Sequence, residues 1–268
     1  MSDIINKIKS AFNSKDIEAT KQLHAQKKHI PEPWHKTEQG KYIGSAVYGA
    51  SDGIITTFAV VAGAAGANLS TGVILILGFA NLLGDGFSMA TGDYLSEKSE
   101  ADYIKSERER EEWEVEVNPA GERHEIREIY SNKGLAGEKL DKIVEIITSD
   151  KKIWVDTMMR EELGLSDAED DSPLKSALIT FFSFIAAGFM PLLAYVFASY
   201  IPFFQQNLFA SATFITALTL FVVGAARTYV TDIKWYKSGL EMLIVGSLSA
   251  GVAYFVGYFV KTFFGITV

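Results

Sequence analysis

Five long apolar stretches limit the folds open to this 268-residue chain more than any other feature of its sequence. They cover residues 43–66, 71–95, 177–201, 208–226 and 240–264. A helix needs about 20 mostly apolar residues to cross the hydrocarbon core of a bilayer, and each stretch has about that length. A water-soluble core could cover two such helices, but too little apolar sequence remains to cover five. The sequence therefore predicts an all-α integral membrane protein with five transmembrane helices.

The charged residues are concentrated outside these stretches, and their distribution divides the chain into four segments. We expect a cytosolic N-terminal lead-in at 1–41, transmembrane helices 1 and 2 in 42–96, a helical soluble domain at 97–173, and transmembrane helices 3 to 5 in 174–268. The mixed charges of the lead-in favour a solvated segment over a helix on the membrane surface. The loops after the first and third spans carry no Lys or Arg, which places the lead-in and the soluble domain in the cytosol.

The soluble domain is predicted to be a set of helices. Residues 96–117 contain neither Gly nor Pro, so we expect them to continue the second span as one charged helix into the cytosol. An Asn-Pro-Ala-Gly turn follows at 118–121. After this turn the sequence predicts three helices and then an acidic linker: helices over 122–131, 136–148 and 150–163, and the linker at 167–171.

Composition restricts the partners and the metal chemistry of the chain. The net charge is −8, and the excess of acid lies in the soluble domain. An acidic surface repels phosphate and attracts cations, so nucleic acid is not an expected partner. The chain has no cysteine, which excludes disulfides and thiolate ligands. A metal ion would have to be bound by carboxylate, imidazole, thioether, backbone or water.

The soluble domain carries carboxylates at helical spacing. Like charges three or four residues apart destabilise a helix unless a cation lies between them. Carboxylates combined with thioethers suit a borderline metal such as ferrous iron. From spacing alone, however, a solvated acidic face paired with Arg108, Arg110, Arg123 and Arg127 is the better explanation, and methionine is a common core residue. The candidate metal ligands are Glu111, Glu114, Glu122, Glu125, Met158, Met159 and Glu162.

Two carboxylates fall well inside predicted spans, away from the span ends. Asp52 lies in the first span and Asp85 in the second, and Met89 follows Asp85 by one helical turn. Carboxylates buried in a membrane are costly and commonly mark an ion path or a proton relay. The alternative is a carboxylate hydrogen-bonded to backbone where nearby glycines loosen the helix. We take Asp52, Asp85 and Met89 as candidate transport-path residues, and attribute Asp93, one turn further, to the polarity of the membrane edge.

Motifs for catalysis are missing from the sequence. His124 is followed by a glutamate but lacks the second histidine of a zinc-protease helix. The sequence lacks the two Glu-x-x-His motifs of a di-iron centre and has no phosphate-binding Gly-Lys-Ser/Thr loop, and its Gly-x-Ser-x-Gly match at residues 49–53 lies inside the first predicted span and not on the strand-to-helix turn of a nucleophile elbow. We therefore expect a protein that is not an enzyme and that holds no prosthetic group.

Several motifs in the chain closely resemble the vacuolar iron transporter family, which includes the yeast vacuolar iron and manganese carrier. The resemblance covers about residues 42–264, and the motifs occur in the family's order. They are Tyr48-Gly49-Ala50-Ser51-Asp52-Gly53, Phe87-Ser88-Met89-Ala90, Tyr94-Leu95, Lys98-Ser99-Glu100, Trp154, Met158-Met159-Arg160, Glu162-Leu163-Gly164-Leu165 and Gly188-Phe189-Met190-Pro191-Leu192-Leu193.

The resemblance implies a homodimer with the ion path between its subunits. It further implies export of ferrous iron from the cytosol in exchange for protons, with manganese as a second candidate ion. It assigns metal binding to the seven Glu and Met positions above, and the membrane path to Asp52 and Met89. Plant-type members carry a glutamate where this chain has Asn81, so Asp85 is the candidate replacement for that proton-coupling residue. The membrane would be vacuolar in a eukaryote and the cell membrane in a prokaryote.

Two other functions are compatible with the sequence. One is a membrane-anchored iron-storage protein or ferroxidase, which would need a di-iron site with histidine that the sequence lacks. The other is a metal sensor without transport, against which the intramembrane Asp52 and Met89 argue. Measurements of oxygen consumption and of reconstituted metal flux would distinguish these from a transporter.

Overall fold

The computed structural model describes residues 14–19, 37–165, 172–229 and 233–265. All regular secondary structure in these residues is helical, which confirms the predicted all-α class. The acidic linker at 167–171 lies outside the described residues. So does most of the lead-in at 1–41, whose predicted solvation is therefore still a prediction.

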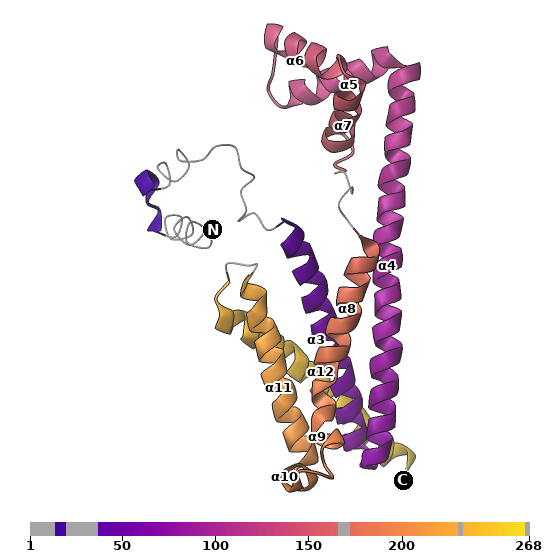
Figure 1. Cartoon of the computed structure of the whole chain (residues 1–268), viewed down its shortest axis with the longest axis vertical. Helices are drawn as coiled ribbons and strands as arrows, with labels where there is room; N and C mark the ends of the chain where they lie inside the picture. Colours follow the sequence, from indigo (N-terminus) through magenta and orange to yellow (C-terminus); the bar gives the residue numbers. More distant parts are fainter. Residues whose placement is uncertain (1–13, 20–36, 166–171, 230–232, 266–268) are drawn as a thin grey trace.

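Five helical segments are long and apolar enough to cross a membrane, as predicted. The first two lie in helices α3 and α4, the third runs from α8 to α9, and the last two are α11 and α12 (Figure 1). The third ends at Val196, whereas the apolar pattern of the sequence predicts an end at Ile201. The helix bounds are Thr37–Gly66 for α3, Thr71–Val117 for α4, Pro173–Gly188 for α8, Leu193–Val196 for α9, Leu208–Ala226 for α11 and Trp235–Phe264 for α12.

The third span is interrupted near Pro191. Helix α8 ends at Gly188, and Pro191 lies in a 3-10 turn, Met190–Leu192, before α9 begins. Proline has no backbone N–H and its ring displaces the carbonyl four residues earlier, so a regular α-helix cannot continue through this position.

Glycines let the membrane helices approach backbone to backbone. A methyl group on Gly53 of α3 would lie 2.4 Å from the carbonyl oxygen of Phe184 on α8, and one on Gly257 of α12 would lie 2.0 Å from the Gly63 carbonyl oxygen. Either methyl group would force the helices apart. Because lipid tails give helices no hydrophobic reason to associate, such close packing is a main source of cohesion in a membrane bundle. Helix α3 packs against α8, α12, α4 and α11 and is the centre of the bundle.

Helix α4 connects the membrane bundle to the soluble domain. Its 47 residues form one unbroken helix, as predicted, and at 1.5 Å per residue it is about 70 Å long. Figure 1 shows it running from the end near the C-terminus up to the soluble domain. It ends at Val117. The side chain of the next residue, Asn118, accepts a hydrogen bond from the Gly121 N–H, and Pro119 then begins α5. The remaining helices of the domain are α5 at Pro119–Asn132, α6 at Glu138–Thr148 and α7 at Lys151–Glu161.

The soluble domain has a small hydrophobic core of its own. Val115 of α4, Ile126 of α5, Val144 of α6 and Val155 of α7 are all buried in one cluster. Ion pairs add links at the surface: Arg108 of α4 lies 2.8 Å from Asp156 of α7. The apolar positions of each helix therefore hold α5, α6 and α7 against the upper end of α4.

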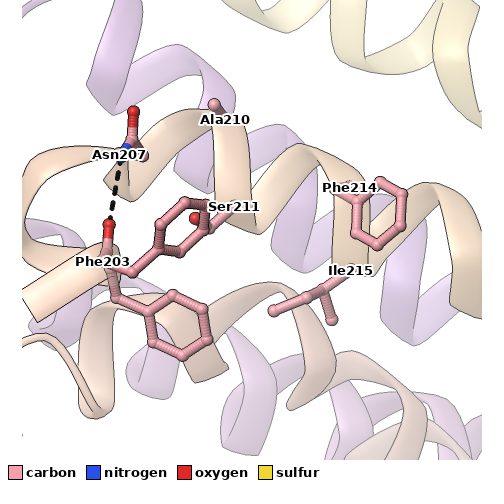
Figure 2. Close-up of a pocket in the computed structure, with 7 residues that line it drawn as sticks. Phe203, Asn207, Ala210, Ser211, Phe214 and Ile215 are labelled. Carbon is pink, nitrogen blue, oxygen red and sulfur yellow. Dashed lines mark hydrogen bonds between the residues drawn. The ribbon is translucent and has the colours of Figure 1, made fainter. Parts of the chain in front are cut away.

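The bundle also contains an apolar cavity at the end opposite the soluble domain. It measures about 500 Å³ and lies between α11 and the short helix α10, Pro202–Gln206 (Figure 2). The Asn207 amide that borders it donates to the Phe203 carbonyl at 3.2 Å. No residue lining this cavity is titratable, so it offers no anionic ligand for a cation. Its walls are Phe203, Phe204, Asn207, Ala210, Ser211, Phe214 and Ile215.

The arrangement gives a direct test of topology. We expect a single cysteine at Lys133 and one at Gln205 to react with a membrane-impermeant reagent from opposite sides, because α5 and α10 lie at opposite ends of the bundle (Figure 1). The chain has no native cysteine, so each variant carries one reporter. Labelling of both positions from one side would refute the odd number of spans between them. A cysteine at Val268 would be a third labelling position, but this residue lies outside the described residues.

Candidate metal centre and membrane path

Three of the predicted metal ligands meet where α4 turns into α5. One carboxylate oxygen from each of Glu111, Glu114 and Glu122 lies within 4.8 Å of the others. Oxygens bound to one divalent ion at about 2.0–2.6 Å are at most about 5 Å apart, so the three can share an ion. The turn at Asn118 produces this geometry, because it folds the first turn of α5 back toward the last turns of α4. We call these three residues the glutamate cluster.

Two of the three glutamates in this cluster are buried and Glu114 is half-buried, whereas the side chains of a solvated acidic face would be exposed. Glu111 is 3% exposed and Glu122 is 4% exposed. The Oε2 atoms of both side chains are buried without a hydrogen-bond partner. A buried carboxylate oxygen without a donor is strongly unfavourable, and a bound cation is one way to relieve that cost.

The arginines proposed as partners of a solvated acidic face pair elsewhere. Arg110 forms an ion pair with Glu107, and Arg127 lies 2.7 Å from Asp141. Arg108 pairs with Asp156. Three of the four arginines thus contact carboxylates outside the glutamate cluster, which leaves the cluster an excess of negative charge.

Burial and mutual repulsion raise the pKa values of this site. The pKa of Glu111 is raised to about 7, first by burial and then by the charges of Glu162, Glu122 and Glu114, against an opposing effect of Arg110. The pKa of Glu122 is also raised to about 7, by burial and then by Glu125, Glu114 and Glu162. Burial and its glutamate neighbours raise the pKa of Glu162 as well. The structure therefore brings each of the five predicted glutamates within electrostatic range of at least two others.

Met158 and Met159 lie in the hydrophobic core of the soluble domain. They are 0% and 2% exposed, in the same cluster as Val115, Ile126 and Trp154. Packing in this core is enough to explain why α7 has methionine at both positions. A thioether contact to a metal ion is still a prediction for them.

In the membrane, Asp52 and Asp85 lie on neighbouring helices. Asp52 of α3 is half-buried and Asp85 of α4 is exposed on this single chain, and they are close enough for their charges to interact. Met89 is half-buried and packs against the main core of the bundle. The Asn81 Nδ2 atom, at the position where plant-type members have glutamate, is buried without a hydrogen-bond partner.

The structure gives Asp93 more than the interfacial role inferred from the sequence. It accepts hydrogen bonds from Thr180 and Ser176 of α8, at 2.9 and 3.2 Å. A sequence signal for this contact did exist: Asp93 continues the four-residue spacing of Asp85 and Met89, and the two hydroxyl residues are themselves one turn apart.

Comparison with known proteins places the chain in a family. The family model described as "VIT family" matches residues 43–258. A vacuolar iron transporter of Toxoplasma gondii is 35% identical over 265 residues, which cover 94% of this chain and 87% of that protein. Vacuolar iron transporter 1 of Arabidopsis thaliana is 33% identical over 224 residues, covering 82% of this chain and 88% of that protein. The relative from Centaurea cyanus, also a vacuolar iron transporter, is 34% identical and covers 82% and 88%.

These matches extend over the membrane helices and the soluble domain alike, and they agree with the motifs seen in the sequence. The family model covers most of the chain, and the relatives are each more than 30% identical over most of their length. The chain belongs to the VIT family.

Proposed function

We propose that this protein transports ferrous iron out of the cytosol across a membrane. The observation that carries the proposal is the glutamate cluster, a largely buried group of carboxylates at the C-terminal end of α4. The same helix runs unbroken from this cluster back to Met89 and Asp85 in the membrane. The names of the relatives support iron as the ion. Manganese, a related divalent ion that accepts oxygen ligands, is a second candidate.

In this mechanism the soluble domain collects the ion and the membrane helices move it. The glutamate cluster binds iron on the cytosolic side, with Glu125, Glu162, Met158 and Met159 completing the donor set. In the membrane the ion loses part of its hydration, and a carboxylate replaces that water. Two subunits facing each other through Asp52 and Met89 would supply two carboxylates and two thioethers around one axis. Thioether contacts favour iron over magnesium or calcium.

Proton exchange follows from the same groups. A carboxyl group with a pKa near 7 releases its proton when a cation binds and takes it back when the cation leaves. In the membrane we assign proton exchange against the ion to Asp52 and Asp85, since Asn81 cannot ionise. We assign the replacement of the missing glutamate to Asp85.

Metal uptake into proteoliposomes tests this function. We expect ferrous iron to accumulate in vesicles of purified protein, faster when the pH gradient drives protons the opposite way. A ferroxidase or storage protein would instead consume oxygen and retain iron, and a sensor would bind iron without flux.

The raised pKa values predict opposite effects of pH on the stability of the protein without metal and on metal binding. In the folded protein the neutral forms of Glu111 and Glu122 are favoured, so this stabilisation is present below about pH 4.5 and is lost as the pH rises through about 7. We therefore expect the melting temperature without metal to fall between pH 5 and pH 8. Metal binding needs the ionised forms, so its affinity should rise over the same interval, by up to about tenfold per pH unit for each proton released.

Thermal unfolding with and without Mn²⁺, a redox-stable substitute for Fe²⁺, measures both effects. The stabilisation by metal should be larger at pH 8 than at pH 6. A metal shift that is the same at both pH values would contradict the assignment of these two glutamates as metal ligands.

A further inference from the structure

A polar network joins three membrane helices at one level of the bundle. Asp93 of α4 accepts a hydrogen bond from the Thr180 hydroxyl at 2.9 Å and one from the Ser176 hydroxyl at 3.2 Å, both on its Oδ2 atom. The hydroxyls of Ser176 and Ser45, on α8 and α3, lie 2.8 Å apart. When Ser176 donates to Asp93, Ser45 can donate to Ser176, so one chain of hydrogen bonds crosses all three helices. We call these four residues the Asp93 clamp.

The partners of Asp93 are fully enclosed. Ser176 and Thr180 are both 0% exposed, so neither water nor lipid can replace the bonds that they make to the carboxylate. At the same level the backbones of α3 and α8 touch, because a methyl group on Gly49 would lie 2.4 Å from the Thr180 carbonyl oxygen. Helices α3 and α8 thus form one unit here, and Asp93 ties α4 to it.

The clamp lies beside the candidate path along α4. Asp93 is one helical turn from Met89 and two turns from Asp85, so the three residues share a face of the helix. A rotation of α4 about its own axis would move all three together. Holding Asp93 on α8 therefore sets the direction in which Asp85 and Met89 are presented to Asp52 on α3.

We propose that Asp93 is a positioning residue, which fixes the rotation of α4 so that Asp85 and Met89 face Asp52, and that it does not itself bind the ion or carry the proton. This inference rests on the proposed transport function. It assigns the importance of Asp93 to its hydrogen bonds and not to its charge.

Three variants separate these two roles. Asp93→Asn keeps an oxygen that can accept from both hydroxyls but removes the charge. Asp93→Ala removes the acceptor. The double variant Ser176→Ala/Thr180→Val removes both donors and keeps the carboxylate. Thr213→Val is the matched control, because the exposed Thr213 hydroxyl donates to the Phe209 carbonyl of its own helix at 2.7 Å and, within the described part of the chain, makes no bond to another helix.

Initial iron flux per folded molecule is the main measurement. We expect flux close to that of the wild type for Asp93→Asn and Thr213→Val, and a loss of about tenfold or more for Asp93→Ala and for the double variant, as misplaced reacting groups typically cause. A large loss in Asp93→Asn would overturn the proposal, because it would show that the charge is what matters. Unchanged flux per folded molecule in Asp93→Ala would overturn it as well, because the clamp would then only stabilise the fold.

Melting temperatures keep this proposal separate from the transport function. The effects of Asp93→Ala and of Thr180→Val should be less than additive, because each removes the same hydrogen bond. If the wild type moved no iron, the proposed function would fail, and this coupling would still report whether the clamp exists. Additive effects in protein that does transport iron would refute the clamp itself.

Discussion

Replacing Asp52 with Asn is expected to reduce the initial rate of iron flux by about 100-fold, while folding and metal binding by the soluble domain stay intact. Asn has nearly the same size as Asp but cannot offer a negative charge to a cation that is losing its water. A loss of about 3 kcal/mol in stabilisation of that ion corresponds to about 100-fold in rate. The half-buried position of Asp52, with the charge of Asp85 close by, is where the structure offers such an ion two carboxylates.

The measurement is initial-rate flux in proteoliposomes with an opposing proton gradient. Asp102→Asn is the matched control, because it makes the same chemical change at an exposed position of α4, beyond the second predicted span. Binding of Mn²⁺ by the detergent-solubilised variant shows whether the soluble domain is still intact. Flux at the wild-type rate in Asp52→Asn would remove Asp52 from the path and leave it as a helix-packing residue.

The second large effect concerns the glutamate cluster. We expect the triple variant Glu111→Gln/Glu114→Gln/Glu122→Gln to lose metal binding at the soluble domain and to be more stable than the wild type without metal at pH 8. The loss of binding follows from the removal of three anionic ligands. The gain in stability follows because the substitutions remove charges whose burial, and then whose mutual repulsion, raises the pKa of Glu111 and Glu122 to about 7.

The opposite directions of these two effects are the informative result. Calorimetry with Mn²⁺ measures binding, and thermal unfolding without metal measures stability. The matched control is Glu109→Gln/Glu112→Gln/Glu128→Gln, which removes the same charge from exposed positions on the same two helices, α4 and α5. Equal metal binding by the two triple variants would restore the interpretation of the glutamates as a solvated acidic face.

Long local patterns could be predicted from the sequence. The five spans follow from apolar length alone, because a helix satisfies its own backbone hydrogen bonds and needs only an apolar surface to enter lipid. The continuation of α4 past the membrane follows from the lack of Gly and Pro over residues 96–117. The end of the third span was misplaced by several residues, because apolar composition continues through the short turns that follow Val196.

The sequence alone also determined which residues could hold a cation, since their types and spacing are local properties. It could not decide between a metal site and a solvated face, because burial depends on how α5 folds back onto α4 at Asn118. Only the tertiary structure encloses Glu111 and Glu122 and directs Arg108 and Arg110 to other carboxylates. The same holds for Asp93: its partners lie more than 80 residues away, and a contact between distant segments exists only once the helices have packed.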